Sequence, residues 1–367
     1  MSNTIHLISD YERNSMENDN WYVSTTCTIE ALKGLGFRVI LHSPTKNKLY
    51  FVKAIKILLK KISRNDMVYI ISTDNFSYDK FTLLKLFRPT VRIFWEIHGV
   101  EEELFWFRNG TLAKLIVAKN KVLRFIYSRF VTASFCLSNP LLEYSSKKLK
   151  IKNSFLISSV VSDKIFDKPR KQSKLKDIFI LNPFESQKNF IVYWAGGEVY
   201  PWQSLDVLEQ VARVIYRLDK NIIFVVVGSN LWHKFSFTDN IVFYKRTTFE
   251  NNIKMASLSN VCLALYSQRI KTVTGYKFYY SPRKIIEFMS LGKPVIATKN
   301  QEIEKIITHS INGFVSNNDA SEIAKLILLL KNKQTLSSNI GARAKEKIYS
   351  NYRIKNLTDM YRGYFKQ

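Results

Sequence analysis

The stretch from Ser281 to Thr298 carries the residues best suited to chemistry. Its sequence, SPRKIIEFMSLGKPVIAT, predicts a helix followed by a buried strand. Ser281 is a good N-cap, and Pro282 suits the first helical position. Arg283 and Lys284 then fall in the first turn, where cations oppose the helix dipole. A bound anion would reverse that penalty, because free backbone amides and two cations would converge on it.

Glu287 lies one turn further along the same helix and shares a face with Arg283 and Lys284. We expect its carboxylate to accept hydrogen bonds from ribose hydroxyls, so that this helix end holds a nucleoside diphosphate. The alternative is a capped helix with a surface Lys284–Glu287 pair and no ligand.

The elements around this helix alternate in type along the whole chain. Short runs rich in β-branched and aromatic residues predict strands at 4–9, 37–42, 67–72, 91–97, 131–138, 154–160, 190–194, 222–227, 241–244, 261–265, 294–298 and 313–315. Helix-periodic stretches separate most of them, which indicates parallel sheets covered on both faces. The predicted fold class is α/β, with two doubly wound Rossmann-like domains facing across a cleft.

The domain organisation follows from a pause in this alternation. Residues 167–189 contain two prolines, many lysines and little periodicity. We therefore expect a first domain at 1–170, a linker at 171–189, a second domain at 190–350, and a closing helix at 351–367 that packs back on the first domain.

The segment from Ser281 to Thr298 also resembles the nucleotide-sugar motif of GT-B glycosyltransferases, in particular the family-four-like bacterial enzymes of surface polysaccharides such as capsule and O-antigen. The pattern is Ser-Pro-x-Lys-x-x-Glu-(Phe/Tyr)-Met-x-x-Gly-Lys-Pro-Val-Ile-Ala-Thr, and similar residues continue downstream to Tyr352. The resemblance implies a GT-B fold and a retaining outcome. It also implies that Glu287 holds the donor ribose and that Ser281, Pro282, Arg283 and Lys284 face the diphosphate.

A second resemblance covers Gly196 and Gly197, which end a strand and precede Trp202-Gln203. Glycines there let a phosphate or sugar approach the backbone closely. Relatives place an Arg and a Lys nearby, where this chain has Glu198 and Trp202, so Lys284, Arg283 and Arg246 are expected to supply the positive charge. Trp202 as a core residue is the alternative.

The family's usual Glu-x7-Glu motif is broken, because Tyr279 stands eight residues before Glu287. We expect Lys277 and Tyr279 to line the sugar pocket instead.

In the first domain, a predicted buried strand runs into His98 and Gly99, and three glutamates follow. The carboxyl end of a strand beside the cleft is where α/β folds place their chemistry. His98 is expected to hydrogen-bond the donor sugar or phosphate, and Glu101 or Glu102 to accept the proton of an acceptor hydroxyl if the reaction inverts. The alternatives are a strand-end histidine that serves only the fold and solvated charges at a helix start.

The composition points to an anionic partner. Lys and Arg number 56 against 30 Asp and Glu, which gives a formal net charge of +26. Residues 46–64 and 114–130 are basic, apolar and free of acids. Such helices favour an anionic membrane surface, although two ordinary outer helices would read the same way. The nucleic-acid motifs are missing from the sequence, so nucleic acid is not an expected partner.

The remaining expectations concern cofactors and place in the cell. The chain has no Asp-x-Asp and only scattered histidines, so neither a metal nor a cofactor is expected, and the co-substrate is a nucleotide-diphosphate sugar, with UDP favoured. Three widely spaced cysteines and a start that does not resemble a signal peptide indicate a cytoplasmic protein, peripheral on the inner face of the membrane.

Together these features predict a glycosyltransferase that moves a sugar from such a donor to a hydroxyl of an oligosaccharide, with a lipid-linked acceptor of bacterial surface polysaccharide synthesis expected. Two alternatives stay open. One is a nucleotide-sugar 2-epimerase of the same fold, and the other is a non-catalytic basic module that binds membranes or nucleic acid.

Overall fold

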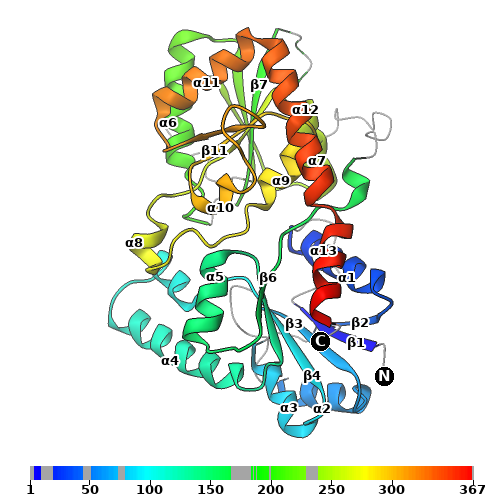
Figure 1. Cartoon of the computed structure of the whole chain (residues 1–367). Helices are drawn as coiled ribbons and strands as arrows, with labels where there is room; N and C mark the ends of the chain where they lie inside the picture. The colour runs from blue at the N-terminus through cyan, green and yellow to red at the C-terminus, as the bar shows by residue number, and fades with distance from the viewer. Residues whose placement is uncertain are drawn as a thin grey trace.

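The computed structural model describes residues 4–9, 20–43, 51–72, 79–166, 183–184, 186, 188–197, 200–228 and 239–365. Within these residues the chain forms two six-stranded parallel sheets. Each sheet belongs to its own domain, and the two domains lie one above the other in Figure 1. This confirms the predicted fold class. The predicted linker lies for the most part outside the described residues.

The first sheet has the strand order β2-β1-β3-β4-β5-β6. The strands are β1 (Thr4–Ile8), β2 (Arg38–His42), β3 (Met67–Ser72), β4 (Arg92–Ile97), β5 (Ala133–Cys136) and β6 (Ser154–Leu156). Most of these strands are continuous apolar runs because helices cover both faces of the sheet. The covering helices are α1 (Asn20–Gly34), α2 (Phe51–Lys61), α3 (Leu84–Phe87), α4 (Thr111–Ser128) and α5 (Asn139–Glu143).

Two short segments of this domain differ from the predicted helices. A 3₁₀ turn at Asp79–Leu83 leads into α3, and a 3₁₀ segment at Glu101–Trp106 follows β4 directly. The register pairs Ile71 of β3 with Glu96 of β4, so both strands end level at the same edge of the sheet.

The second sheet has the order β12-β11-β10-β7-β8-β9. The strands are β7 (Phe190–Ala195), β8 (Ile222–Val227), β9 (Ile241–Tyr244), β10 (Val261–Ala264), β11 (Val295–Thr298) and β12 (Phe314–Ser316). The helices are α6 (Leu205–Leu218), α7 (Phe249–Leu258), α8 (Ile270–Thr274), α9 (Arg283–Ser290), α10 (Gln301–Glu304), α11 (Ala320–Asn332) and α12 (Gln334–Asn351).

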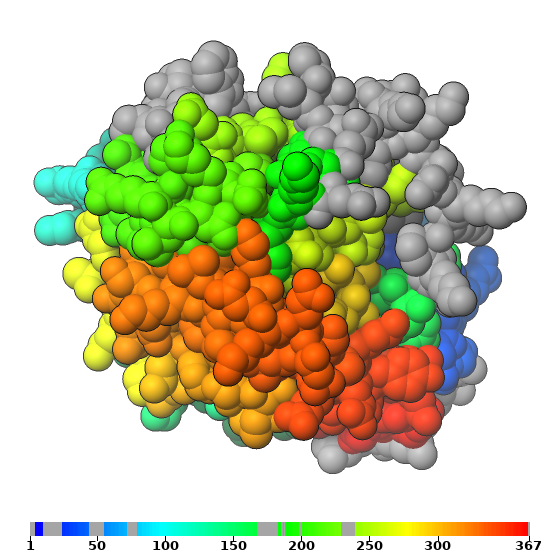
Figure 2. Space-filling view, turned by 90° about the horizontal axis from the view of Figure 1, so that it is seen from above, coloured from blue at the N-terminus to red at the C-terminus, as the bar shows by residue number. Residues whose placement is uncertain are grey.

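The last helix, α13 (Ile354–Phe365), leaves the second domain and lies beside α1 of the first (Figure 1). Leu357 and Tyr361 are buried in the same apolar cluster as Ile5 and Phe135. Seen from above, the second domain covers most of the molecule, and the end of the chain emerges at one edge beside residues of the first domain (Figure 2). The chain therefore crosses between the domains twice.

Direct contacts join the two domains. The Ser138 hydroxyl donates to the Tyr279 carbonyl at 2.8 Å, and the Tyr144 and Tyr276 rings meet edge to face. Trp202 stacks on Tyr280 within the second domain and also contacts Trp106 of the first, with ring centroids 6.4 Å apart. Trp202 thus belongs to an aromatic cluster that bridges the domains.

Candidate active site

The start of α9 differs from its predicted cap. Pro282 occupies the N-cap position and makes no side-chain capping bond. The Ser281 hydroxyl instead meets the Ser159 hydroxyl of the first domain. The Arg283 amide donates to the Ser281 carbonyl at 2.9 Å. The prediction of Ser281 as a capping side chain was wrong, because the contact between domains engages its hydroxyl.

Arg283 pairs with Glu287 one turn along α9, with Nε 2.7 Å from Oε1. Glu287 is only 1% exposed. Burial raises the pKa of Glu287, and the Arg283 guanidinium acts in the opposite direction. Arg283 also interacts with Cys27 of α1 and lines a small pocket with Glu96 and Ser159 of the first domain. This residue therefore sits at the domain interface.

Lys284 reaches different partners from Arg283. Its Nζ donates to Oε1 of Gln203 at 2.6 Å and lies 4.8 Å from the centre of the Trp194 ring and 5.3 Å from that of Tyr266. Burial lowers the pKa of Lys284 to about 7, against the opposing effect of the Glu287 charge. The expected convergence of both cations on one point is thus not seen in this structure, and Lys284 alone is turned toward Gln203.

Gly196 lies against the side chain of Gln203, the hydrogen-bond partner of Lys284. A Cβ atom at Gly196 would lie 1.9 Å from Oε1 of Gln203, so a larger residue would displace the end of that side chain from its place beside Lys284. A Cβ atom at Gly228, where φ is +97°, would lie 2.2 Å from the Gly196 carbonyl oxygen. Gly197 is the second residue after the end of β7. Gln203 was not among the predicted site residues, because its contact with Lys284 spans 81 positions.

The residues expected at the sugar pocket are scattered. Tyr279 is completely buried, and its hydroxyl donates to that of Tyr280 at 3.0 Å, so its role in a sugar pocket stays a prediction. Lys277 is exposed, and its charge acts on Glu143 of the first domain. Arg246 is exposed beyond the end of the edge strand β9.

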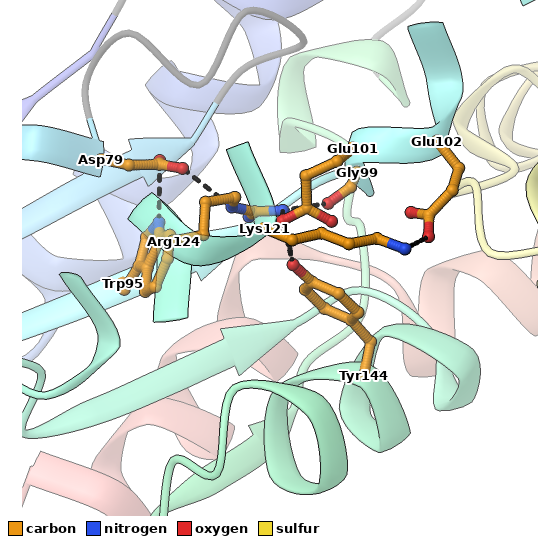
Figure 3. Close-up of polar contacts among 8 residues, drawn as sticks. All are labelled: Asp79, Trp95, Gly99, Glu101, Glu102, Lys121, Arg124 and Tyr144. Carbon is orange, nitrogen blue, oxygen red and sulfur yellow. Dashed lines mark hydrogen bonds and ion pairs between the residues drawn. The ribbon is translucent and has the colours of Figure 1, made fainter. Parts of the chain in front are cut away.

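Glu101 and Glu102 are held inside the first domain (Figure 3). Glu101 accepts from the Tyr144 hydroxyl at 2.5 Å and from Nη1 of Arg124 at 3.4 Å. Arg124 is itself fully buried and also pairs with Asp79 at 2.9 Å. Glu102 pairs with Lys121 at 2.5 Å. Both carboxylates are buried and paired with cations, an arrangement that disfavours the predicted role of proton acceptor.

His98 lies just beyond the end of β4. Its Nε2 is 2.6 Å from Oε1 of Glu96, and 7% of its side chain is exposed. Glu96 lines the same pocket as Arg283. His98 is thus linked through Glu96 to the pocket at the domain interface, and the segment that carries Glu101 and Glu102 contacts α8 of the second domain.

Comparison with known proteins agrees with this arrangement. Residues 176–347 match the family model described as "Glycosyl transferases group 1". The second domain is therefore similar in sequence to group 1 glycosyltransferases. The matched region contains Gly196, Gln203, Lys284 and Glu287.

A curated relative is similar in sequence to part of this chain. It is N-acetyl-alpha-D-glucosaminyl L-malate synthase of Bacillus anthracis, 22% identical over 161 residues, or 42% of this chain. The chain spans 40% of that relative's length in the match.

Solved structures extend the likeness to the whole chain. Sucrose-phosphate synthase of Thermosynechococcus elongatus superposes with a TM-score of 0.73 at 15% identity, covering 99% of each chain. HepE of Anabaena, in complex with UDP and glucose, gives 0.66 at 12% identity, also over 99% of each chain. A mutant of TarM from S. aureus, in complex with fondaparinux, alpha-GlcNAc-glycerol and UDP, gives 0.60 at 17%, covering 85% of this chain and 58% of TarM. These likenesses establish the GT-B fold.

Neither a metal cluster nor a membrane span is found in the described part of the chain. No group of three or more His, Cys, Asp and Glu residues there is arranged to hold a metal ion. None of the helices described is both long and apolar enough to cross a bilayer.

Proposed function

We propose that this protein transfers a sugar from a nucleoside-diphosphate sugar, with UDP as the favoured nucleotide, to a carbohydrate hydroxyl. The observation that carries the proposal is the position of Lys284, a buried amine in the first turn of α9 beside Gln203 and Gly196. HepE, which shares the fold, is described with bound UDP and glucose. A diphosphate beside Lys284 would meet the positive charge of the protonated amine and the positive end of the α9 dipole together.

The other residues take roles around this point. Glu287 holds the ribose, after Arg283 has shifted from its pairing with that carboxylate. His98, across the domain interface, meets the transferred sugar. Lys284 and Arg283 neutralise the leaving diphosphate without a metal ion, consistent with a sequence that lacks Asp-x-Asp.

We further propose that the acceptor is a lipid-linked oligosaccharide of bacterial surface polysaccharide synthesis and that the first domain docks on an anionic bilayer. The exposed apolar residues of α4 fall on one side of the helix: Leu112, Leu115, Val122, Phe125 and Ile126. Lys114, Lys119 and Arg129 accompany them, and α4 contains no acid. Such a basic amphipathic helix suits the surface of an anionic membrane.

The position of α4 supports this docking. Figure 1 shows α2, α3 and α4 at the end of the first domain that faces away from the second. Leu86 and Phe87 of α3 and Ile57 of α2 are also exposed there, and α2 ends in Lys60 and Lys61. A bilayer at this end would receive apolar side chains and cations together, with the second domain pointing away from it.

Thermal unfolding with a panel of nucleotides tests the donor site. UDP, GDP, ADP, CMP, dTDP and UDP-sugars are each added to the full chain, and a UDP compound is expected to raise the midpoint. A ligand at about 100 times its Kd adds about 2.7 kcal/mol of stability. Sugar transfer to an oligosaccharide acceptor is then measured with and without excess EDTA, and it should persist with EDTA.

The outcomes separate the competing functions. If no nucleotide or nucleotide sugar in the panel raises the midpoint, the proposed donor site is refuted. If UDP-sugar alone yields an epimer without any acceptor, the protein is a 2-epimerase of the same fold. Transfer that stops with EDTA and returns with a divalent cation would refute metal independence alone.

A further inference from the structure

Glu96 contacts the imidazole of His98 from the interior of the first domain. The two residues are two positions apart, so their side chains leave the end of β4 on the same side. Oε1 of Glu96 lies 2.6 Å from Nε2 of His98. Glu96 is buried.

The second oxygen of Glu96 is held just as closely. The Tyr69 hydroxyl of β3 donates to Oε2 at 2.6 Å, and the Tyr361 hydroxyl of α13 lies 2.7 Å from that of Tyr69. Burial, together with the Glu96 charge, holds the pKa of Tyr69 well above its usual range, so Tyr69 keeps the proton that it donates. Since Tyr69 has one proton, Tyr361 must donate to Tyr69.

The direction of these hydrogen bonds determines which ring nitrogen of His98 carries a proton. An ionised carboxylate only accepts hydrogen bonds, so both of its partners must be donors. Tyr69 supplies one proton, and Nε2 of His98 therefore carries the other. In the neutral ring this leaves Nδ1 as the acceptor nitrogen.

We propose that Glu96 is a positioning residue for sugar transfer, which fixes His98 as the Nε2–H tautomer and holds its ring at the domain interface. Tyr69 and, through it, Tyr361 of the crossing helix α13 hold Glu96 in place. The proposal rests on the proposed function, in which His98 meets the sugar. Glu96 and Arg283 line one pocket, so this chain of hydrogen bonds ends beside the first residue of α9.

The experiment combines a spectroscopic and a kinetic measurement on the full chain. Nitrogen-15 NMR of histidine-labelled protein, with His98→Asn used only to assign the signal, reports which ring nitrogen carries the proton. Wild type is compared with Glu96→Ala, Glu96→Gln and Tyr69→Phe. Tyr216→Phe, which removes an exposed hydroxyl bonded to Asp239 on the second domain, is the matched control.

We expect wild type to show the Nε2–H tautomer alone and Glu96→Ala to show a mixture. Glu96→Ala should lower kcat at least about 10-fold, because general acid–base and orienting groups are worth that much or more, while the donor KM changes less than 2-fold. Glu96→Gln keeps an acceptor oxygen and should restore the tautomer and part of kcat. Tyr69→Phe should lower kcat less than Glu96→Ala.

Two results would overturn the positioning role: an unchanged tautomer in Glu96→Ala, or a kcat within 2-fold of wild type in that folded variant. If Glu96→Ala fails to fold, the same comparison is made with Glu96→Gln and Tyr69→Phe, and a kcat within 2-fold of wild type in both would overturn it. A wild type without transfer activity on any donor would instead refute the proposed function, and the NMR result would still decide whether Glu96 sets the tautomer.

Discussion

At the scale of single residues, Lys284 is the side chain whose protonation matters most. Its pKa of about 7 in the folded protein lies well below the value of about 10.4 expected in the unfolded chain. Between these two values the unfolded state binds more protons than the folded state, so the stability of the free protein rises with pH in that window. Below pH 7 the folded protein carries a buried charge that an anionic ligand would offset.

Lys284→Met should therefore raise the unfolding midpoint of the free protein at pH 6, and the gain should shrink toward pH 10. The variant removes a buried charge that costs stability only where the amine is protonated. The same substitution should abolish the stabilisation by UDP. Thermal unfolding at pH 6 and pH 10, with and without UDP, measures both effects.

Lys293→Met is the matched control for this prediction. Lys293 lies just beyond the C-terminal end of α9, and burial also lowers its pKa. Its Nζ donates to the Ser259 carbonyl. The Lys293→Met substitution should alter the pH dependence of stability and leave the stabilisation by UDP intact. Equal loss of the UDP response in both variants would contradict the assignment of Lys284.

At the scale of elements, the cluster of Arg124, Asp79 and Glu101 ties α4 to the segments on either side of β4. Arg124 also donates to the Gly99 carbonyl at 3.0 Å and lies over the Trp95 ring. These contacts hold the turn that carries His98. Removing the guanidinium would leave two buried carboxylates without a cation.

Arg124→Met should destabilise the protein by about 3–5 kcal/mol, because it leaves charges buried and uncompensated. Glu101→Gln should lower the unfolding midpoint less, since the amide oxygen still accepts a hydrogen bond. Its kcat per folded molecule should stay within a few-fold of wild type. Denaturant unfolding and steady-state kinetics test this, and a kcat loss of 100-fold or more in stable Glu101→Gln would restore Glu101 as a proton acceptor.

The strands were predictable because a strand covered on both faces needs a continuous apolar run. The expected range 67–72 is β3 itself, and 222–227 is β8. Lys284 could be singled out from the sequence because a cation in the first turn of a helix opposes the helix dipole, which indicates a bound anion. Helix type was harder to predict, because α5 continues into a π-helical turn at Tyr144–Lys148.

The roles of the glutamates could not be read from their spacing. The partners of Glu101 come from two other elements, Arg124 in α4 and Tyr144 after α5. Likewise, Ser281 has the composition of a cap, and only the approach of Ser159 from the other domain shows why it does not act as one. Contacts between distant segments carry no local sequence signal.

At the scale of the whole molecule, the proposed orientation on a membrane depends on α4. Leu115→Ser removes a side chain that is 62% exposed, and Leu218→Ser on α6 of the second domain removes another that is also 62% exposed. The two substitutions are therefore a matched pair on opposite domains.

Leu115→Ser should weaken sedimentation with vesicles of phosphatidylcholine and phosphatidylglycerol, whereas Leu218→Ser should not. Lys114→Gln with Lys119→Gln should weaken it further, because each cation near an anionic surface contributes about 1 kcal/mol. Vesicles of phosphatidylcholine alone should bind less protein. Equal binding by Leu115→Ser and wild type, or binding unaffected by vesicle charge, would refute the docking proposal.

The crossing of α13 has a consequence for how the protein is made. Leu357 and Tyr361 complete an apolar cluster that also contains Ile5 and Phe135. During synthesis, the six strands of the first domain are made long before Leu357 and Tyr361. Part of the apolar cluster of the first domain therefore stays exposed until the second domain and α13 have been synthesised.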